Sequence, residues 1–193
     1  DKFLAALTKK YPDFPVLDLR PILLAAKKNE ILYHQTDTHW NKRGGHYAYV
    51  EIMKMLKIAP HLRGDFSNKE DEKTRGDISD IMNSSAENID YSLTPKFTPL
   101  SARNKNAEKE FSGFHRLHIF DNSNQNLPRL FVYKDSFFGE LTGMVSEHFS
   151  RSLYVNEFPC DLKWEILKNH RPNLVIQEFW EGRVEVVLSQ CQQ

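Results

Sequence analysis

Apolar positions along the chain alternate between helical spacing and short continuous runs. Helices are expected where apolar residues recur at helical spacing, and strands where they form a short run between turn signals. The predicted helices cover about residues 3–11, 22–28, 41–58, 139–148 and 161–169. The predicted strands cover 14–19, 31–33, 115–120, 130–133, 152–158 and 173–179, of which 14–19 and 173–179 are expected to be buried and 115–120 to lie at an edge. Strands that alternate with helices indicate an α/β domain with a mostly parallel sheet flanked by helices.

Residues 62–114 interrupt this pattern. Charged and small polar residues dominate the segment, and one short helix is expected near 77–83. We therefore expect a single domain over residues 1–193 that carries a long irregular insertion on its rim. Insertions of this length often serve as lids or binding loops.

Candidate chemistry follows two of the predicted strands. Asp37 and His39 come after the run 31–33, and Ser136 comes after the run 130–133 at a turn into a helix. Ligands of open α/β sheets bind beyond the carboxyl ends of strands. A serine hydroxyl needs a base, and the base needs an acceptor that orients it, so these residue types predict a Ser-His-Asp triad. Two structural alternatives remain open: Ser136 as a helix cap, and the Asp37–His39 pair as a turn before a capped helix.

The blocks around these residues resemble a known family. Asp37-Thr38-His39-Trp40 is followed in order by Gly76-Asp77-Ile78, by Lys134-Asp135-Ser136-Phe137 and by a closing strand at 175–179 with Glu181 and Arg183. These blocks resemble the Asp-x-His-Trp branch of alginate O-acetyltransferase-like proteins in the SGNH hydrolase-like superfamily. The resemblance implies a three-layer SGNH-hydrolase-like fold. It also implies that Ser136 accepts an acetyl group, with His39 as base and Asp37 as its orienting partner.

The resemblance implies a substrate and a location as well. The acceptor would be a hydroxyl of a cell-surface or secreted polysaccharide such as alginate. The acetyl group would come from a membrane-bound acyltransferase. The protein would be periplasmic or otherwise extracytoplasmic. Asp1 opens directly in a helical pattern, so we expect a fragment whose upstream signal or anchor is missing.

Further residues near these blocks are candidates for the substrate pocket, and they are Trp40, Tyr133, Lys134, Gln177 and Arg183. Trp40 suits either a wall of the site or the core. Arg183 suits either the carboxylate of an acidic sugar or an ion pair with Glu178 or Glu181. Lys134 departs from the superfamily motif, which has glycine at that place and so permits a close backbone approach.

A metal site is the competing interpretation of the histidines. His34, Asp37 and His39 are permissible ligands, and so are His115 and His118. However, the chain has no compact zinc spacing of the His-Glu-x-x-His kind, so we expect neither a metal nor another cofactor.

Composition narrows the classes of partner. The net charge is +0 with both signs interspersed, which argues against a nucleic-acid partner. No apolar run approaches the roughly 20 residues that span a bilayer, so this fragment is not expected to cross a membrane. The 2 cysteines, Cys160 and Cys191, are too few for a disulfide framework and are expected to be unpaired.

Two other functions remain open at this point. A carbohydrate acetylesterase would use the same acetyl-serine but pass the acetyl group to water. A non-catalytic polysaccharide-binding module would keep the fold without the chemistry, since fold does not imply function.

Overall fold

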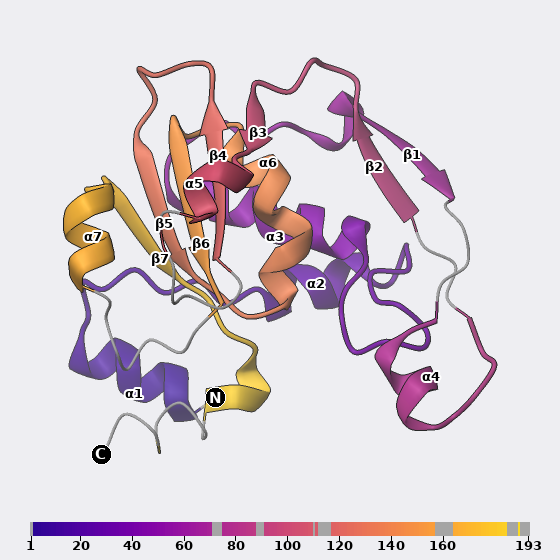
Figure 1. The fold of residues 1–193 in the computed structure, drawn as a ribbon. Coiled ribbons are helices and arrows are strands. Elements are labelled where there is room, and N and C mark those ends of the chain that lie inside the picture. The colour runs from indigo at the N-terminus through magenta and orange to yellow at the C-terminus, as the bar shows by residue number, and fades with distance from the viewer. Residues whose placement is uncertain are drawn as a thin grey trace.

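A five-stranded sheet divides the computed structural model into two apolar layers (Figure 1). The structure describes residues 2–70, 75–87, 91–109, 111, 117–156, 164–184 and 189. The strands lie in the order β3 (Ser101–Arg103), β4 (Leu117–Asn122), β6 (Arg151–Val155), β5 (Arg129–Tyr133) and β7 (Leu174–Gln177). β5, β6 and β7 are parallel to one another, and only β4 runs against the other four strands. The expectation of a mostly parallel sheet is therefore confirmed.

Alternate side chains of β5 point into the two apolar layers. Leu130 and Val132 pack with α2 (Arg20–Ala26), α3 (Lys42–Met55) and α6 (Thr142–Ser146). Phe131 and Tyr133 lie in the other layer, with α5 (Lys105–Lys109) and α7 (Trp164–His170). This alternation is the period of an extended strand, and it gives three layers with helices on both faces.

The long helix α3 follows the predicted active-site loop directly. Asn41 caps it, because its side-chain oxygen accepts hydrogen bonds from the backbone N–H groups of Arg43 and Gly44. Gly44 is required for close packing, since a Cβ there would lie 2.5 Å from the carbonyl oxygen of Leu32. The buried face of α3, with Tyr49 at 0 % exposure, then fixes the helix against the sheet.

Residues 62–114 contain more regular structure than the sequence predicts. A 3-10 turn, η1 (Arg63–Asp65), leads into β1 (Phe66–Glu70), which pairs with β2 (Tyr91–Pro95) as an antiparallel hairpin. The predicted short helix is α4 (Asp77–Ile81), and the segment also supplies β3 and α5. Figure 1 shows the hairpin and α4 beyond α3, on the side away from the sheet. The alternation in β1 and β2 is weak because their outer faces are polar or exposed.

Four predicted strands need correction. Residues 31–33 form no strand, because Tyr33 makes only an isolated bridge with Trp40. Residues 14–19 form no strand; Pro15 has no N–H to donate, and Asp18 binds the backbone and side chain of Arg20 instead. β4 is internal and not an edge strand, because β3 covers its outer side. β7 is the edge strand and not a buried one, and Val175 is 54 % exposed.

The remaining helical elements are short. They are α1 (Lys2–Lys10), which has no buried residue, η2 (Phe137–Leu141), which runs into α6, and η3 (Glu181–Arg183). No helix in the described part of the chain combines the length and apolar character needed to cross a membrane. Cys160, Cys191, His115 and the start of the helix expected at 161–169 lie outside the described residues.

Candidate active site

Asp37 and His39 lie on a short loop whose ends are tied together. Residues 34–39, here called the base loop, are closed by an antiparallel bridge between Tyr33 and Trp40. The backbone N–H of His34 donates to the carbonyl of His39 at 3.1 Å. The ends of the loop are therefore fixed to each other immediately before α3, and the loop carries Asp37 and His39 between them.

The structure brings the three predicted triad residues together. His39 Nε2 lies 2.7 Å from Ser136 Oγ, across 97 positions of the chain. His39 Nδ1 lies 2.6 Å from Asp37 Oδ1. In the tautomer that can serve as a base, Nδ1 donates to Asp37 and Nε2 accepts from the serine hydroxyl. Ser136 is exposed, so a substrate can reach its oxygen.

The Asp37 carboxylate is held in its charged form. Partial burial alone would raise its pKa. The hydrogen bonds from the N–H and ring of His39 and from the N–H of Asp77 outweigh this effect and lower the pKa below its ordinary value. Asp37 is therefore equipped to orient the imidazole and to stabilise it when protonated.

The Gly76-Asp77 block supports the base loop from the insertion. Asp77 accepts from the N–H and hydroxyl of Thr38 at 2.8 and 2.6 Å. A Cβ on Gly76 would lie 2.0 Å from the carbonyl oxygen of Thr36, so only glycine allows this approach. The sequence showed this block through the resemblance, but nothing in its spacing showed that it holds the base loop.

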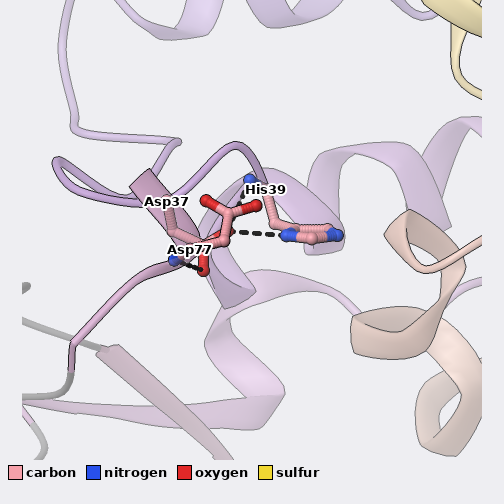
Figure 2. A group of neighbouring side chains, drawn as sticks. All are labelled: Asp37, His39 and Asp77. Carbon is pink, nitrogen blue, oxygen red and sulfur yellow. Dashed lines mark hydrogen bonds and ion pairs between the residues drawn. The ribbon is translucent and has the colours of Figure 1, made fainter. Parts of the chain in front are cut away.

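Asp37, His39 and Asp77 form one cluster, and the dashed lines in Figure 2 join Asp37 to His39 and to the backbone N–H of Asp77. One ligand atom from each lies within 4.8 Å of the others, so the cluster has the composition of a small cation site. Its oxygen and nitrogen atoms are already engaged by hydrogen bonds within the loop. The contact between Asp37 and His39 within the cluster is the one that the predicted triad requires.

Ser136, the predicted nucleophile, lies in a turn whose backbone donors are mostly occupied. In residues 134–137, here called the nucleophile turn, the N–H of Lys134 donates to Val155 at 2.9 Å. The N–H of Asp135 donates to Glu178 Oε2 at 3.1 Å, and the N–H of Phe137 donates to Asp135 Oδ1 at 2.9 Å. Among the described residues, no acceptor is recorded for the N–H of Ser136. This N–H group is therefore the backbone donor of the turn that remains available to another partner.

An aromatic contact joins the base loop to the nucleophile turn. The indole N–H of Trp40 donates to the carbonyl of Phe137 at 2.9 Å. The Phe137 ring lies 4.7 Å from the His39 ring between centroids. The two predicted blocks are thus fixed to each other behind the reacting atoms.

The five predicted pocket residues divide into two groups. Trp40, Tyr133 and Lys134 are 5, 1 and 6 % exposed, and the Lys134 ammonium donates to the carbonyl of Asp135. The expectation that these three contact a substrate does not fit their burial, since their side chains fill the space behind the site. Gln177 and Arg183 are exposed, Gln177 at the last position of β7 and Arg183 in η3 after it, so a substrate can reach them.

The sequence profile of one family matches residues 1–122 of the chain, which is more than half of its length. The profile is described as the SGNH hydrolase-like domain of the acetyltransferase AlgX. The chain belongs to this family. The match contains Asp37, His39 and Asp77 and ends before Ser136, so it supports the base loop more directly than the nucleophile turn. No curated protein sequence matches the chain closely enough to count as a relative.

Solved structures show the same fold at low sequence identity. A DHHW family protein from Eubacterium siraeum is 17 % identical with a TM-score of 0.65, and the match covers 81 % of this chain and 61 % of that one. Bacillus cereus PatB1 with a sulfonyl adduct is 17 % identical with a TM-score of 0.60, covering 84 % and 67 %. The O-acetyltransferase domain of Pseudomonas putida AlgJ is 15 % identical with a TM-score of 0.53, covering 92 % and 63 %. The chain thus spans about three fifths of the length of the first of these structures.

Proposed function

We propose that the protein transfers acetyl groups to hydroxyls of a polysaccharide through an acetyl-serine intermediate on Ser136. The observation that carries the proposal is the continuous contact from Ser136 through His39 to Asp37, at 2.7 and 2.6 Å. This arrangement supplies a nucleophile, a base and an orienting carboxylate. Membership of an acetyltransferase family supports acyl transfer as the reaction class.

The reaction proceeds in two halves. His39 Nε2 takes the Ser136 proton as Oγ attacks the acetyl carbonyl, and the N–H of Ser136 stabilises the oxyanion. The donor oxygen then leaves with the proton from His39, and acetyl-serine remains. In the second half His39 deprotonates a sugar hydroxyl, which attacks the acetyl carbon. Collapse of the second tetrahedral intermediate returns the proton to Ser136 and releases the acetylated sugar.

Gln177 and Arg183 are the proposed acceptor contacts. Both are exposed, and an arginine binds the carboxylate of an acidic sugar such as a uronate in a bidentate manner. The acetyl donor would be presented by a membrane-bound acyltransferase. The site would then work in the periplasm or another extracytoplasmic space, where a secreted polysaccharide is accessible.

A carbohydrate acetylesterase is the second candidate, because Ser136 is exposed and water can reach the acetyl-enzyme. A product assay distinguishes acetyl transfer from hydrolysis. The protein is incubated with an aryl acetate, with and without an oligouronate, and acetylated sugar and free acetate are measured by mass spectrometry. Acetylated sugar that depends on Ser136 supports transfer. Free acetate alone, at a rate indifferent to the sugar, supports hydrolysis and rejects transfer.

An Arg183→Ala variant tests the acceptor contact. The proposal predicts about a tenfold weaker apparent affinity for an acidic oligosaccharide, with little change in the first half-reaction. An Arg183→Ala variant that treats acidic and neutral oligosaccharides as the parent protein does would contradict the assignment.

A further inference from the structure

A second carboxyl group lies behind the nucleophile turn, and the mechanism above does not use it. Glu178 follows β7, and its N–H donates to the carbonyl of Tyr133 at 2.9 Å, which extends the pairing of β7 with β5 by one residue. β5 and β7 lie side by side in Figure 1. This register sets the Glu178 side chain beside Asp135, whose N–H donates to Glu178 Oε2 at 3.1 Å.

The Asp135 carboxylate connects the segment that follows β5 with the segment that follows β7. Its Oδ1 accepts from the N–H of Phe137 at 2.9 Å, one residue after the nucleophile. Its Oδ2 accepts from the N–H of Trp180 at 2.6 Å, in the segment after β7. Asp135 is 7 % exposed, so water does not replace these bonds easily. The position of Ser136 therefore depends on where the Asp135 carboxylate is held.

The Glu178 carboxyl group lies against the nucleophile turn, where it accepts from the Asp135 N–H. Burial and then the negative charge of Asp135 raise the pKa of Glu178 to about 8, while the hydrogen bond from the Asp135 N–H and the charge of Lys134 oppose the shift. Asp135 and Lys134 are the charged groups that act on Glu178 among the described residues. Below that pH Glu178 is a neutral acid, and its hydroxyl is able to donate to the neighbouring Asp135 side chain. Above it, two adjacent carboxylates repel each other.

We infer that Glu178 is a positioning residue for Ser136: its neutral carboxylic acid holds Asp135, and Asp135 holds the backbone N–H groups of Phe137 and Trp180 that fix the nucleophile turn. The inference rests on the proposed role of Ser136. It assigns to the closing strand of the sheet a direct part in preparing the nucleophile. Ionisation of Glu178 loosens Asp135, so the reactivity of Ser136 declines as pH rises through that ionisation.

The first test follows the rate at which Ser136 is acetylated by an aryl acetate, read by intact mass across neutral and alkaline pH. The parent protein is expected to be about tenfold slower near pH 9 than near pH 7. Glu178→Gln keeps the shape and hydrogen bonds of the neutral acid but cannot ionise. It should retain the neutral rate within about threefold and lose the alkaline decline. Glu178→Ala removes both bonds and should be about tenfold slower at every pH.

The matched control is Glu51→Gln, which makes the same change in a carboxylate that pairs with Lys54 on α3 at 2.7 Å. It should keep the parent profile, including the alkaline decline. The inference is overturned if Glu178→Gln declines at alkaline pH as the parent does, or if the parent shows no decline.

A second readout does not depend on activity. In Ser136→Ala, the amide resonances of Phe137 and Trp180 should shift together with the titration of Glu178, and Glu178→Gln should abolish both shifts. The inference is overturned if the amide resonances of Phe137 and Trp180 do not shift as Glu178 titrates. If no protein form acquires an acetyl group at any pH, the proposed function fails, and the amide titration alone then decides whether Glu178 positions the turn.

Discussion

The base loop and the nucleophile turn reach the same site by opposite structural means. The base loop is partly exposed, and a short segment of the insertion holds it through Gly76 and Asp77. The nucleophile turn continues β5, which is buried from Leu130 to Tyr133, and Asp135 and Glu178 hold the turn from within. Local changes in the insertion should therefore disturb the base with little cost in stability. Changes behind the nucleophile turn should affect stability and reactivity together.

The largest effect is expected where the two segments meet. Ser136→Ala and His39→Ala should each lower turnover of an aryl acetate by about 10⁴-fold, because triad members act as a unit. The double variant should be hardly slower than either single variant. Steady-state kinetics of the three proteins measure this, and multiplicative losses would show that the two residues act independently.

Gly76→Ala isolates the support of the base loop. The added Cβ would lie 2.0 Å from Thr36 O and 2.6 Å from the Cβ of Asp37, so the loop must move. We expect kcat to fall by about 10- to 100-fold, since small misplacements of catalytic groups are costly. The melting temperature should change little, because α4 adds only Ser79 to the buried residues.

Gly64→Ala is the control for this change, because its Cβ would meet nothing within 4 Å. It should leave kcat at the parent value. Equal activity of the Gly76 and Gly64 variants would mean that the insertion does not position the base.

Lowering the pH tests how much a buried histidine against β5 contributes to stability. His170 is 2 % exposed, donates from Nε2 to the carbonyl of Leu130 at 2.8 Å, and has a pKa that burial lowers to about 4. In the unfolded chain the pKa of His170 returns to its ordinary value of 6.5. Between pH 6.5 and about pH 4 the unfolded state therefore binds more protons than the folded state does. Stability should therefore fall as pH drops through this window, by on the order of 1–3 kcal/mol from this group.

Denaturant unfolding at neutral pH and near pH 4 measures this loss. His170→Gln keeps a donor for Leu130 but takes up no proton, so it should remove part of the acid sensitivity. An unchanged pH dependence in that variant would assign the loss to other groups, such as His148, whose pKa burial also lowers to about 4.

The smallest effect is expected at the hydrogen bond from the Trp40 indole to the carbonyl of Phe137. Trp40→Phe removes the hydrogen bond to Phe137 while keeping an aromatic ring, and should cost about 1 kcal/mol with a several-fold loss of kcat. Trp164→Phe is the control, since Trp164 is 62 % exposed on α7. If the two variants behave alike in unfolding and kinetic measurements, the Trp40 hydrogen bond does not help to hold the base loop against the nucleophile turn.

The sequence predicts the types of the three site residues and the place of Ser136 after a strand, because those depend on local patterns. The strand expected before Asp37 and His39 is only an isolated bridge between Tyr33 and Trp40. It does not predict their separation in space, since Ser136 and His39 are 97 positions apart and meet only through the sheet and α3. The error at 14–19 has a local cause, because an apolar run with Pro15 inside it lacks a donor for a ladder. The sequence suggested Glu178 only as an ion-pair partner of Arg183, because its contact with Asp135 depends on the register of two parallel strands.

The measurement that tests the central claim most directly is the intact mass of the protein after brief mixing with a chromogenic acetyl ester, beside Ser136→Ala. The account predicts the gain of one acetyl group, located on Ser136 by peptide mapping and lost in the variant. No gain in folded protein that includes the segments found in its longer relatives would contradict a serine nucleophile. The contact between His39 and Ser136 would then be structural, and a polysaccharide-binding module would describe the protein better.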